Sequence, residues 1–214
     1  MKFLCLPILF TFLVFQSSCA RKATDEIDSG SFNGNSYSNA FFGMTLDLPP
    51  DWYIPAKEVF ENAIDVGGEM MSGDDKNMKQ AIKASTEHNL VTLFLASEHP
   101  PGSPVESNPN INAIAERVKH APGIQKGTDY LFHTKKALEA SAMKVTFKGG
   151  FTTTTMAGKD FGVMELDMAI GGQLMHQRHF ATVMNGFAIQ FVITYVTEEE
   201  EQELMHILDT LDFE

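Results

Sequence analysis

The clearest hydrophobic pattern lies in the last third of the chain. Between Val145 and Tyr195, apolar and polar residues alternate in runs that are separated by short turn sequences, which is typical of half-buried strands. The alternation is strictest at Phe187, Ile189, Phe191 and Ile193. Three turns divide the segment: residues 157–160, Gly171-Gly172, and Asn185-Gly186, a favoured two-residue hairpin sequence. The segment therefore predicts an antiparallel meander.

Earlier segments predict a hairpin, two helical stretches and another strand. Residues 37–48 alternate as a hairpin does, with the turn near residues 39–43. Residues 56–85 carry helical spacing, interrupted at Gly67-Gly68 and at Ser72-Gly73, and Asp74 is expected to cap the second helix. The continuous apolar run Leu90–Ala96 predicts a central strand buried on both faces.

Three more helices are expected. Asn108 and Pro109 resemble a helix start, and the spacing of Ile111, Ile114, Ala115 and Val118 predicts the buried stripe of a helix. Residues 128–142 predict another helix. Thr197 to Glu200 forms a capping box, followed by a last helix with apolar residues Leu204, Ile207, Leu208 and Leu211.

This order of elements indicates the fold class. A meander with helices before and after it predicts an α+β protein, in which helices pack on an antiparallel β-sheet. The domain is expected to cover residues 37–214, a length that suits a single core.

The N-terminus predicts export. Lys2 supplies a positive start, residues 3–15 are almost wholly apolar, and small residues follow at 17–20. The apolar run is shorter than the roughly 20 residues that a membrane-spanning helix needs. Residues 1–18 therefore read as a signal peptide.

The cysteines add an anchor. The chain has two, and Cys5 leaves with the leader, so Cys19 remains without a disulfide partner. Residues 15–19 (FQSSC) resemble the bacterial lipobox in Ser17, Ser18 and Cys19, with Gln16 in place of the usual leucine. That resemblance implies a lipid on Cys19. The alternative is ordinary cleavage after Ala20 and secretion.

Between the leader and the domain, residues 19–36 are polar and rich in Ser, Gly and Asn, so they predict a flexible tether. The formal net charge of the chain is -12. Such acidity argues against a nucleic-acid partner, because lysine and arginine must neutralise phosphates, and against general attraction to anionic lipid.

Sequence motifs at both ends of the domain resemble a known family. The aromatic hairpin of residues 37–48 with Pro49-Pro50-Asp51-Trp52, the helix start at residues 108–111, and the closing residues 186–195 and 211–213 resemble the PsbP-like and Mog-type α/β/α sandwich. The resemblance implies that fold over residues 37–214. It implies a binding or assembly role and no shared catalytic residue.

Catalytic and metal-binding motifs are absent from the sequence. It contains no G-x-S-x-G, P-loop or H-E-x-x-H pattern. His176 and His179 are three residues apart on a predicted strand, so they face opposite sides and cannot bind one ion together. We therefore expect no enzyme activity, no metal and no cofactor.

The two glycine-containing turns predict a register and, from it, a polar patch. Two-residue turns at Gly171-Gly172 and Asn185-Gly186 set Asp167 opposite His176, Glu165 opposite Arg178, and His176 opposite Tyr195. These five residues should share one face of the sheet. Two interpretations stay open: cross-strand ion pairs that fix the register, or a recognition patch for a partner.

The sequence thus predicts an exported, lipid-anchored binding or assembly module of the bacterial cell envelope. It would lie on the periplasmic face of a membrane, or be secreted, and would bind a protein partner. An exported hydrolase or a small-ligand carrier are the alternatives. A carrier would need an apolar pocket of several hundred Å³.

Overall fold

The computed structural model describes residues 27–214, which form two antiparallel sheets and four helices. The large sheet has the strand order β4-β5-β10-β9-β8-β6, with β7 also paired to β8. Its strands are β4 (Leu90–Ser97), β5 (Asn110–Arg117), β6 (Val145–Phe147), β7 (Thr152–Met156), β8 (Lys159–Ile170), β9 (Gln173–Met184) and β10 (Phe187–Tyr195). The small sheet orders β1 (Ser31–Asn33), β2 (Ser36–Asn39), β3 (Met44–Asp47) and β11 (Asp212–Phe213) side by side.

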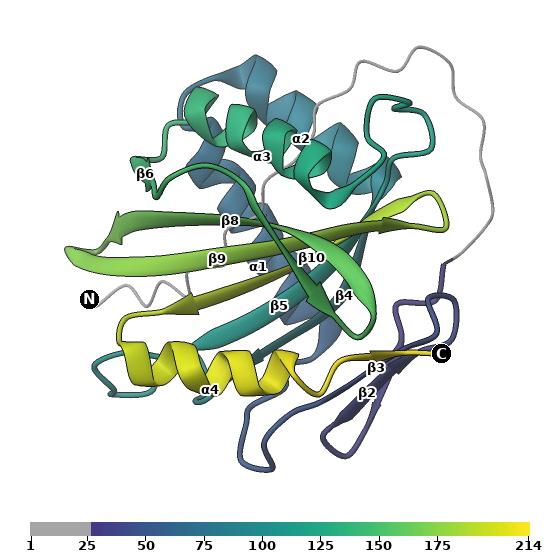
Figure 1. The fold of residues 1–214 in the computed structure, drawn as a ribbon. Helices are drawn as coiled ribbons and strands as arrows, with labels where there is room; N and C mark the ends of the chain where they lie inside the picture. The colour runs from purple at the N-terminus through teal and green to yellow at the C-terminus, as the bar shows by residue number, and fades with distance from the viewer. Residues whose placement is uncertain (1–26) are drawn as a thin grey trace.

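Helices cover both faces of the large sheet (Figure 1). One face packs against α1 (Lys57–Ser72), α2 (Lys76–Asn89) and α3 (Gly127–Ala140). The other packs against α4 (Glu198–Leu208) and the small sheet. The predicted α+β class, an antiparallel sheet with helices packed on it, is confirmed.

Aromatic side chains fill the core between the large sheet and the small one. Tyr37 of β2 lies 4.8 Å from the ring of Phe94 of β4, and Phe94 lies 6.4 Å from Phe191 of β10, measured between ring centroids. Phe161 of β8 lies 6.1 Å from Phe191 on the other side. Tilted rings at these separations are favourable beyond the area they bury. The stack therefore couples the N-terminal hairpin to the centre of the meander.

Most of the predicted elements are present. The hairpin of residues 37–48, the helix of residues 128–142 and the last helix all form, with ends shifted by a few residues. The Thr197 side chain accepts a hydrogen bond from the backbone N–H of Glu200, and the Glu200 carboxylate accepts one from the backbone N–H of Thr197, so the capping box is confirmed. The meander has the three predicted turns.

The predicted helix beginning at Asn108 is wrong, because residues 110–117 form β5. Seven of its eight residues, Asn110 through Glu116, are buried, so both faces of the strand are covered and no two-residue alternation marks it. The spacing of Ile111, Ile114 and Ala115 matches a helix by coincidence. A strand covered on both faces loses the periodic signal that distinguishes it from a helix.

Leu90–Ala96 forms the expected strand, but at the edge of the sheet instead of its centre. Its last residues are buried on both faces, and Tyr53 pairs with Ser97 on the outer side. Burial follows here from the layers above and below the strand. An apolar run reports burial and gives no information on strand order.

Two smaller predictions about the helices are also corrected. Helix α1 continues through Gly67-Gly68, where a Cβ on Gly68 would lie 3.0 Å from Ile82 of α2, so the glycine permits close helix packing. The cap of α2 is Asp75, whose side chain accepts from the backbone N–H groups of Asn77 and Met78. Asp74 lies one residue before it.

The range predicted for the tether, residues 19–36, extends too far towards the C-terminus, because its last residues form a strand. Ser31–Asn33 forms β1 and pairs with β2, and the Phe32 ring lies 5.3 Å from that of Tyr37. Ser, Gly and Asn are abundant here because they build a tight turn, with Gly34 at φ 61. Residues 1–26, including the signal peptide and Cys19, lie outside the described part of the chain.

Two glycines allow α3 to touch the sheet directly. A Cβ on Gly127, the first residue of α3, would lie 1.6 Å from the carbonyl oxygen of Ala181. A Cβ on Gly162 of β8 would lie 2.5 Å from the backbone nitrogen of Thr128. These neighbours are backbone atoms, which cannot rotate away as a side chain can, so any larger residue must separate helix from sheet.

We expect Gly162→Ala to lower the free energy of unfolding by about 2 kcal/mol or more, because overpacking a close contact strains the backbone. Urea denaturation measures the change. Gly123→Ala is the matched control, since a Cβ there would meet nothing within 4 Å. Equal stability of the two variants would contradict the close contact.

His179 belongs to a buried hydrogen-bonded chain beneath the helices. Gln190 Nε2 donates to His179 Nδ1 at 2.9 Å, His179 Nε2 donates to Gln177 Oε1 at 3.0 Å, and Gln177 Nε2 donates to Thr194 at 2.9 Å. The chain requires a neutral imidazole with its proton on Nε2. Burial lowers the pKa of His179 from 6.5 to about 3.

This shift predicts a pH-dependent stability. Because the folded-state pKa is depressed, the unfolded chain binds the extra proton first, and stability is lost as pH falls from 6.5 towards 3. The slope due to this residue is at most about 1.4 kcal/mol per pH unit. His179→Gln should flatten the curve of unfolding free energy against pH in that window. A variant with the wild-type slope would refute the assignment.

Candidate functional site

The predicted register is present in the structure. Glu165 pairs with Arg178 and Asp167 with His176 across β8 and β9, and His176 pairs with Tyr195 across β9 and β10. The turns carry positive φ at both central residues: 61 and 89 at Gly171-Gly172, and 53 and 81 at Asn185-Gly186. Such turns match the right-handed twist of the flanking strands, so they determine the pairing.

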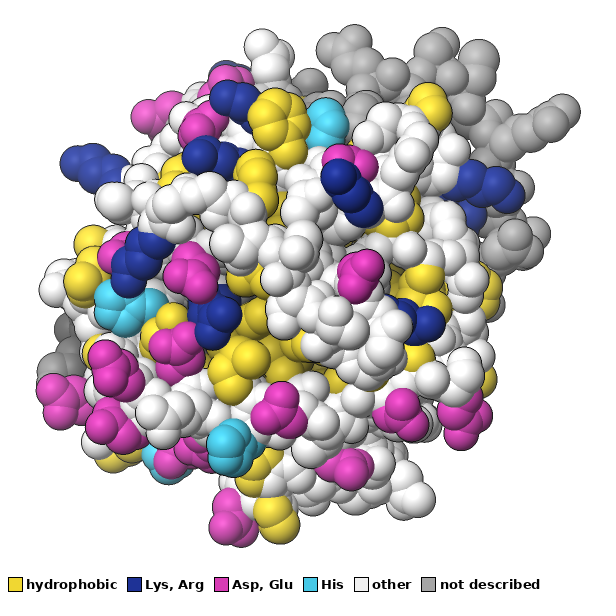
Figure 2. Space-filling model, viewed as in Figure 1, with side chains coloured by type: hydrophobic (Ala, Val, Ile, Leu, Met, Phe, Trp, Pro, Cys, Tyr) yellow, Lys and Arg dark blue, Asp and Glu magenta, His cyan; other side chains and the backbone are white. Residues whose placement is uncertain are grey.

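The structure brings the five residues together on the sheet face that α4 covers. His176 Nδ1 lies 2.6 Å from Asp167 Oδ1, and Arg178 Nε lies 3.2 Å from Glu165 Oε1. The His176 and Tyr195 rings are 5.6 Å apart between centroids. Figure 2 shows acidic, basic and histidine side chains gathered on this face beside an apolar area. We call these five residues, together with Lys148 and Glu201, the polar network.

Two members of the polar network were not predicted: Lys148 and Glu201. Lys148 Nζ lies 2.8 Å from Asp167 Oδ1, and Arg178 Nη1 donates to Glu201 Oε1 at 2.8 Å. Lys148 follows the three-residue strand β6, and its backbone N–H bonds to the carbonyl of Glu165. Glu201 belongs to α4, which packs on the sheet from outside the meander. No short-range pattern indicates where such a short strand or a separate helix meets the sheet.

Arg178 is the centre of the polar network. Its guanidinium forms an ion pair with Glu165 of β8 and donates a hydrogen bond to Glu201 of α4, and its Cζ lies 5.2 Å from the ring centroid of Phe180. A planar guanidinium suits two carboxylates and an aromatic face at once. Arg178 therefore fastens α4 to the sheet, so these ion pairs stabilise the fold.

Electrostatics in the polar network follow from burial and pairing. Partial burial opposes ionisation of Asp167, but hydrogen bonds from Lys148 and His176 and their charges outweigh it and hold the pKa of this carboxyl below its usual value. Burial, and then the charge of Glu201, raise the pKa of the Tyr195 hydroxyl. Both groups stay in one charge state near neutral pH, which suits a structural or docking role.

The histidines behave as predicted, since His176 lies in the polar network and His179 in the buried chain on the opposite face. Within residues 27–214, no three His, Cys, Asp or Glu side chains converge as metal ligands would. No helix in the same range is both long and apolar enough to cross a bilayer.

Comparisons with known proteins give structural likeness alone. No family model matches the chain, and no curated protein is similar to it in sequence. A crystal structure from Bacteroides thetaiotaomicron matches 80% of this chain at 10% identity and a TM-score of 0.43, and this chain spans 45% of that longer chain.

Two further solved structures match at similar levels. LpqN of Mycobacterium tuberculosis, described as involved in cell envelope biogenesis, matches 79% of this chain and 82% of its own, at 12% identity and a TM-score of 0.42. Cyanobacterial PsbP (CyanoP) from Synechocystis matches 93% and 99%, at 14% identity and a TM-score of 0.48. All of these TM-scores are below 0.5, so we infer no function from them.

The fastening role of Arg178 is testable by a double-mutant cycle with Glu201. We expect a coupling energy of about 1 kcal/mol, because both side chains are partly buried and their geometry is fixed. The exposed pair Lys136–Glu139 on α3 is the control, with an expected coupling of about 0.3 kcal/mol. Urea denaturation of the single and double Gln variants measures both coupling energies. Equal values would contradict the role of Arg178 in holding α4 to the sheet.

Proposed function

We propose that this protein is an exported, lipid-anchored and non-enzymatic binding or assembly module of the bacterial cell envelope. The observation that carries the proposal is the N-terminal pattern: Lys2, the apolar residues 3–15, and Cys19, which is the sole cysteine left after leader removal. A lone cysteine that carries lipid needs no disulfide partner. Two acyl chains on one cysteine give the stable attachment that one chain does not.

The charge distribution supports an orientation for the anchored domain. Residues 28–56 and 196–214, which build the small sheet and α4, contain no Lys or Arg. They include the exposed carboxylates Asp28, Asp47, Asp51, Glu198, Glu199, Glu203, Asp209 and Asp212. Figure 2 shows acidic side chains along the half of the face where α4 lies. An anionic lipid surface repels this layer, so we propose that it faces away from the membrane.

The recognition surface of the module is proposed to be the exposed side of the polar network. Glu165 is 41% exposed at its side chain and Lys148 is 46% exposed, whereas Arg178 and Asp167 are largely covered. The covered members hold the sheet and α4, and the exposed ones remain accessible to a protein partner. A partner would therefore meet a rigid, pre-arranged set of charges.

The test compares Cys19→Ser with the wild type in a bacterial host supplied with labelled fatty acid. Wild-type protein should incorporate label, carry the mass of a lipid, and sediment with membranes, whereas Cys19→Ser should do none of these. Cys5→Ser is the matched control, because that cysteine leaves with the leader and labelling should persist. If Cys19→Ser stays membrane-bound after leader cleavage, the lipid anchor is refuted.

The same membrane preparations test the recognition surface. Glu165→Gln removes the charge of an exposed member of the polar network without placing a second cation beside Arg178. We expect it to weaken a complex recovered from the envelope, with only a small loss of thermal stability, because Arg178 keeps its ion pair with Glu201. Lys144→Gln, on an exposed residue outside the network, should leave the complex intact. A complex unaffected by Glu165→Gln would assign the polar network to stability alone.

A further inference from the structure

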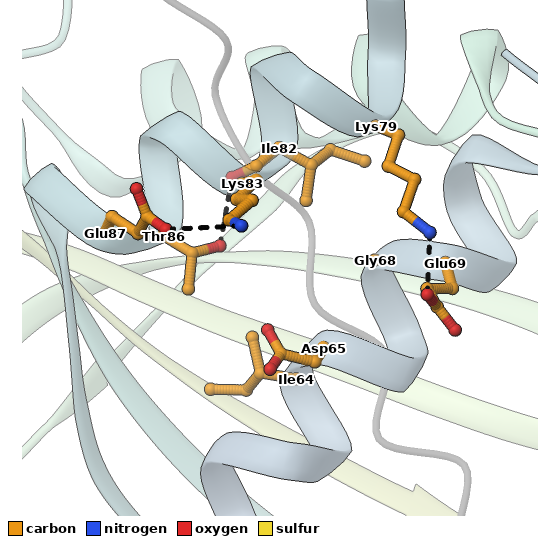
Figure 3. Close-up of a pocket in the computed structure, with 9 residues that line it drawn as sticks. All are labelled: Ile64, Asp65, Gly68, Glu69, Lys79, Ile82, Lys83, Thr86 and Glu87. Carbon is orange, nitrogen blue, oxygen red and sulfur yellow. Dashed lines mark hydrogen bonds and ion pairs between the residues drawn. The ribbon is translucent and has the colours of Figure 1, made fainter. Parts of the chain in front are cut away.

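A groove begins between α1 and α2, on the sheet face opposite α4, and continues past the start of the edge strand β4 to Arg117 and Phe187, whose side chains lie on the face that packs against the small sheet. Two adjoining cavities of about 480 Å³ each share the lining residues Ile64, Asp65, Thr86 and Glu87. Figure 3 shows the inner one, with Ile64 and Asp65 of α1 below and Thr86 and Glu87 of α2 above. Volumes of this size fall within the roughly 300–1,000 Å³ of small-molecule sites.

The outer cavity has a mixed lining, in which polar and charged side chains predominate over apolar ones. Ile64 of α1, Val91 of β4 and Phe187 of β10 line it. Ile64 belongs to the core and is 2% exposed, so this part of the wall is rigid. Leu90 and Val91 at the start of β4 are partly exposed and offer apolar surface to the side chains of a bound molecule, and the polar groups around them would set its orientation.

Arg117 and Asp65 bring to that cavity two charges that form no ion pair with any residue between 27 and 214. Arg117 is held with its Cζ 4.9 Å from the ring centroid of Phe187, and it makes no ion pair or side-chain hydrogen bond with any residue in the range 27–214. Asp65 also has no ion-pair partner in that range. In Figure 3 its carboxylate points into the space below Thr86.

The other charged side chains that line the groove are paired with each other. Lys79 lies 2.7 Å from Glu69, Lys83 lies 3.8 Å from Glu87, and Lys57 lies 3.6 Å from Glu61. One guanidinium and one carboxylate therefore remain for a ligand. A ligand with a single charge would pair with only one of these two groups. A molecule that carries both an anionic and a cationic group would pair with the guanidinium and the carboxylate together.

We propose that this cavity binds a short peptide with free ends. The peptide carboxylate would accept paired hydrogen bonds from the guanidinium of Arg117, and its ammonium group would donate to Asp65. Its apolar side chains would contact Leu90 and Val91. The inference does not depend on Cys19, because an unlipidated protein has the same cavity.

The experiment measures binding of the tripeptide Ala-Leu-Ala to the mature chain by calorimetry, beside the same peptide with an acetylated N-terminus and an amidated C-terminus. We expect the free peptide to bind at least tenfold more tightly than the blocked one. Arg117→Gln and Asp65→Asn should each weaken the free peptide about tenfold, the loss of one charge-assisted interaction. For the blocked peptide, both variants should match the wild type.

Lys144→Gln and Asp74→Asn are matched controls, since each removes one exposed charge outside the cavity, and both should bind as the wild type does. Three results would overturn the proposal: no binding of the free peptide, equal binding of the blocked peptide, or unchanged affinity in both cavity variants. The comparison of free and blocked peptide uses wild-type protein, so it holds even if a variant fails to fold.

Discussion

The pairing of β8, β9 and β10 is the constraint on which the rest of the structure depends. Side chains alternate between the two faces of a strand, so a slip of one residue would exchange the aromatic core with the polar chain of His179, Gln177 and Gln190. The turns Gly171-Gly172 and Asn185-Gly186 prevent that slip through their backbone geometry. The correct register places Phe161, Phe180 and Phe191 in one core and the polar network at its margin.

The helices on the two faces of this sheet are held to it by different interactions. On one face, Gly127 and Gly162 let α3 lie against the strands, while α1 and α2 pack over β4 and leave the groove between them. On the other face, α4 is held by its apolar stripe and by Arg178. Residues of the polar network thus hold α4 to the sheet and form the proposed recognition surface, whereas the groove shares no residue with that network.

The two proposals place binding at different parts of one sheet: the polar network lies on the face that α4 covers, and the groove passes around the edge strand β4. The polar network offers charges that are already paired, which suits docking of a folded partner. The groove offers a guanidinium and a carboxylate without partners between residues 27 and 214, which suits a small zwitterionic ligand.

The sequence by itself determined whatever depends on neighbouring residues. Two-residue turns, strict alternation in β10 and the capping box at Thr197 are local, so the meander, its register and five members of the polar network could be derived before any coordinates. Tertiary structure decided the rest. Residues 110–117 became a strand because both faces are buried, Lys148 and Glu201 joined the network from distant segments, and the groove exists only because α1 and α2 meet above β4. These features arise from long-range packing, which no local pattern records.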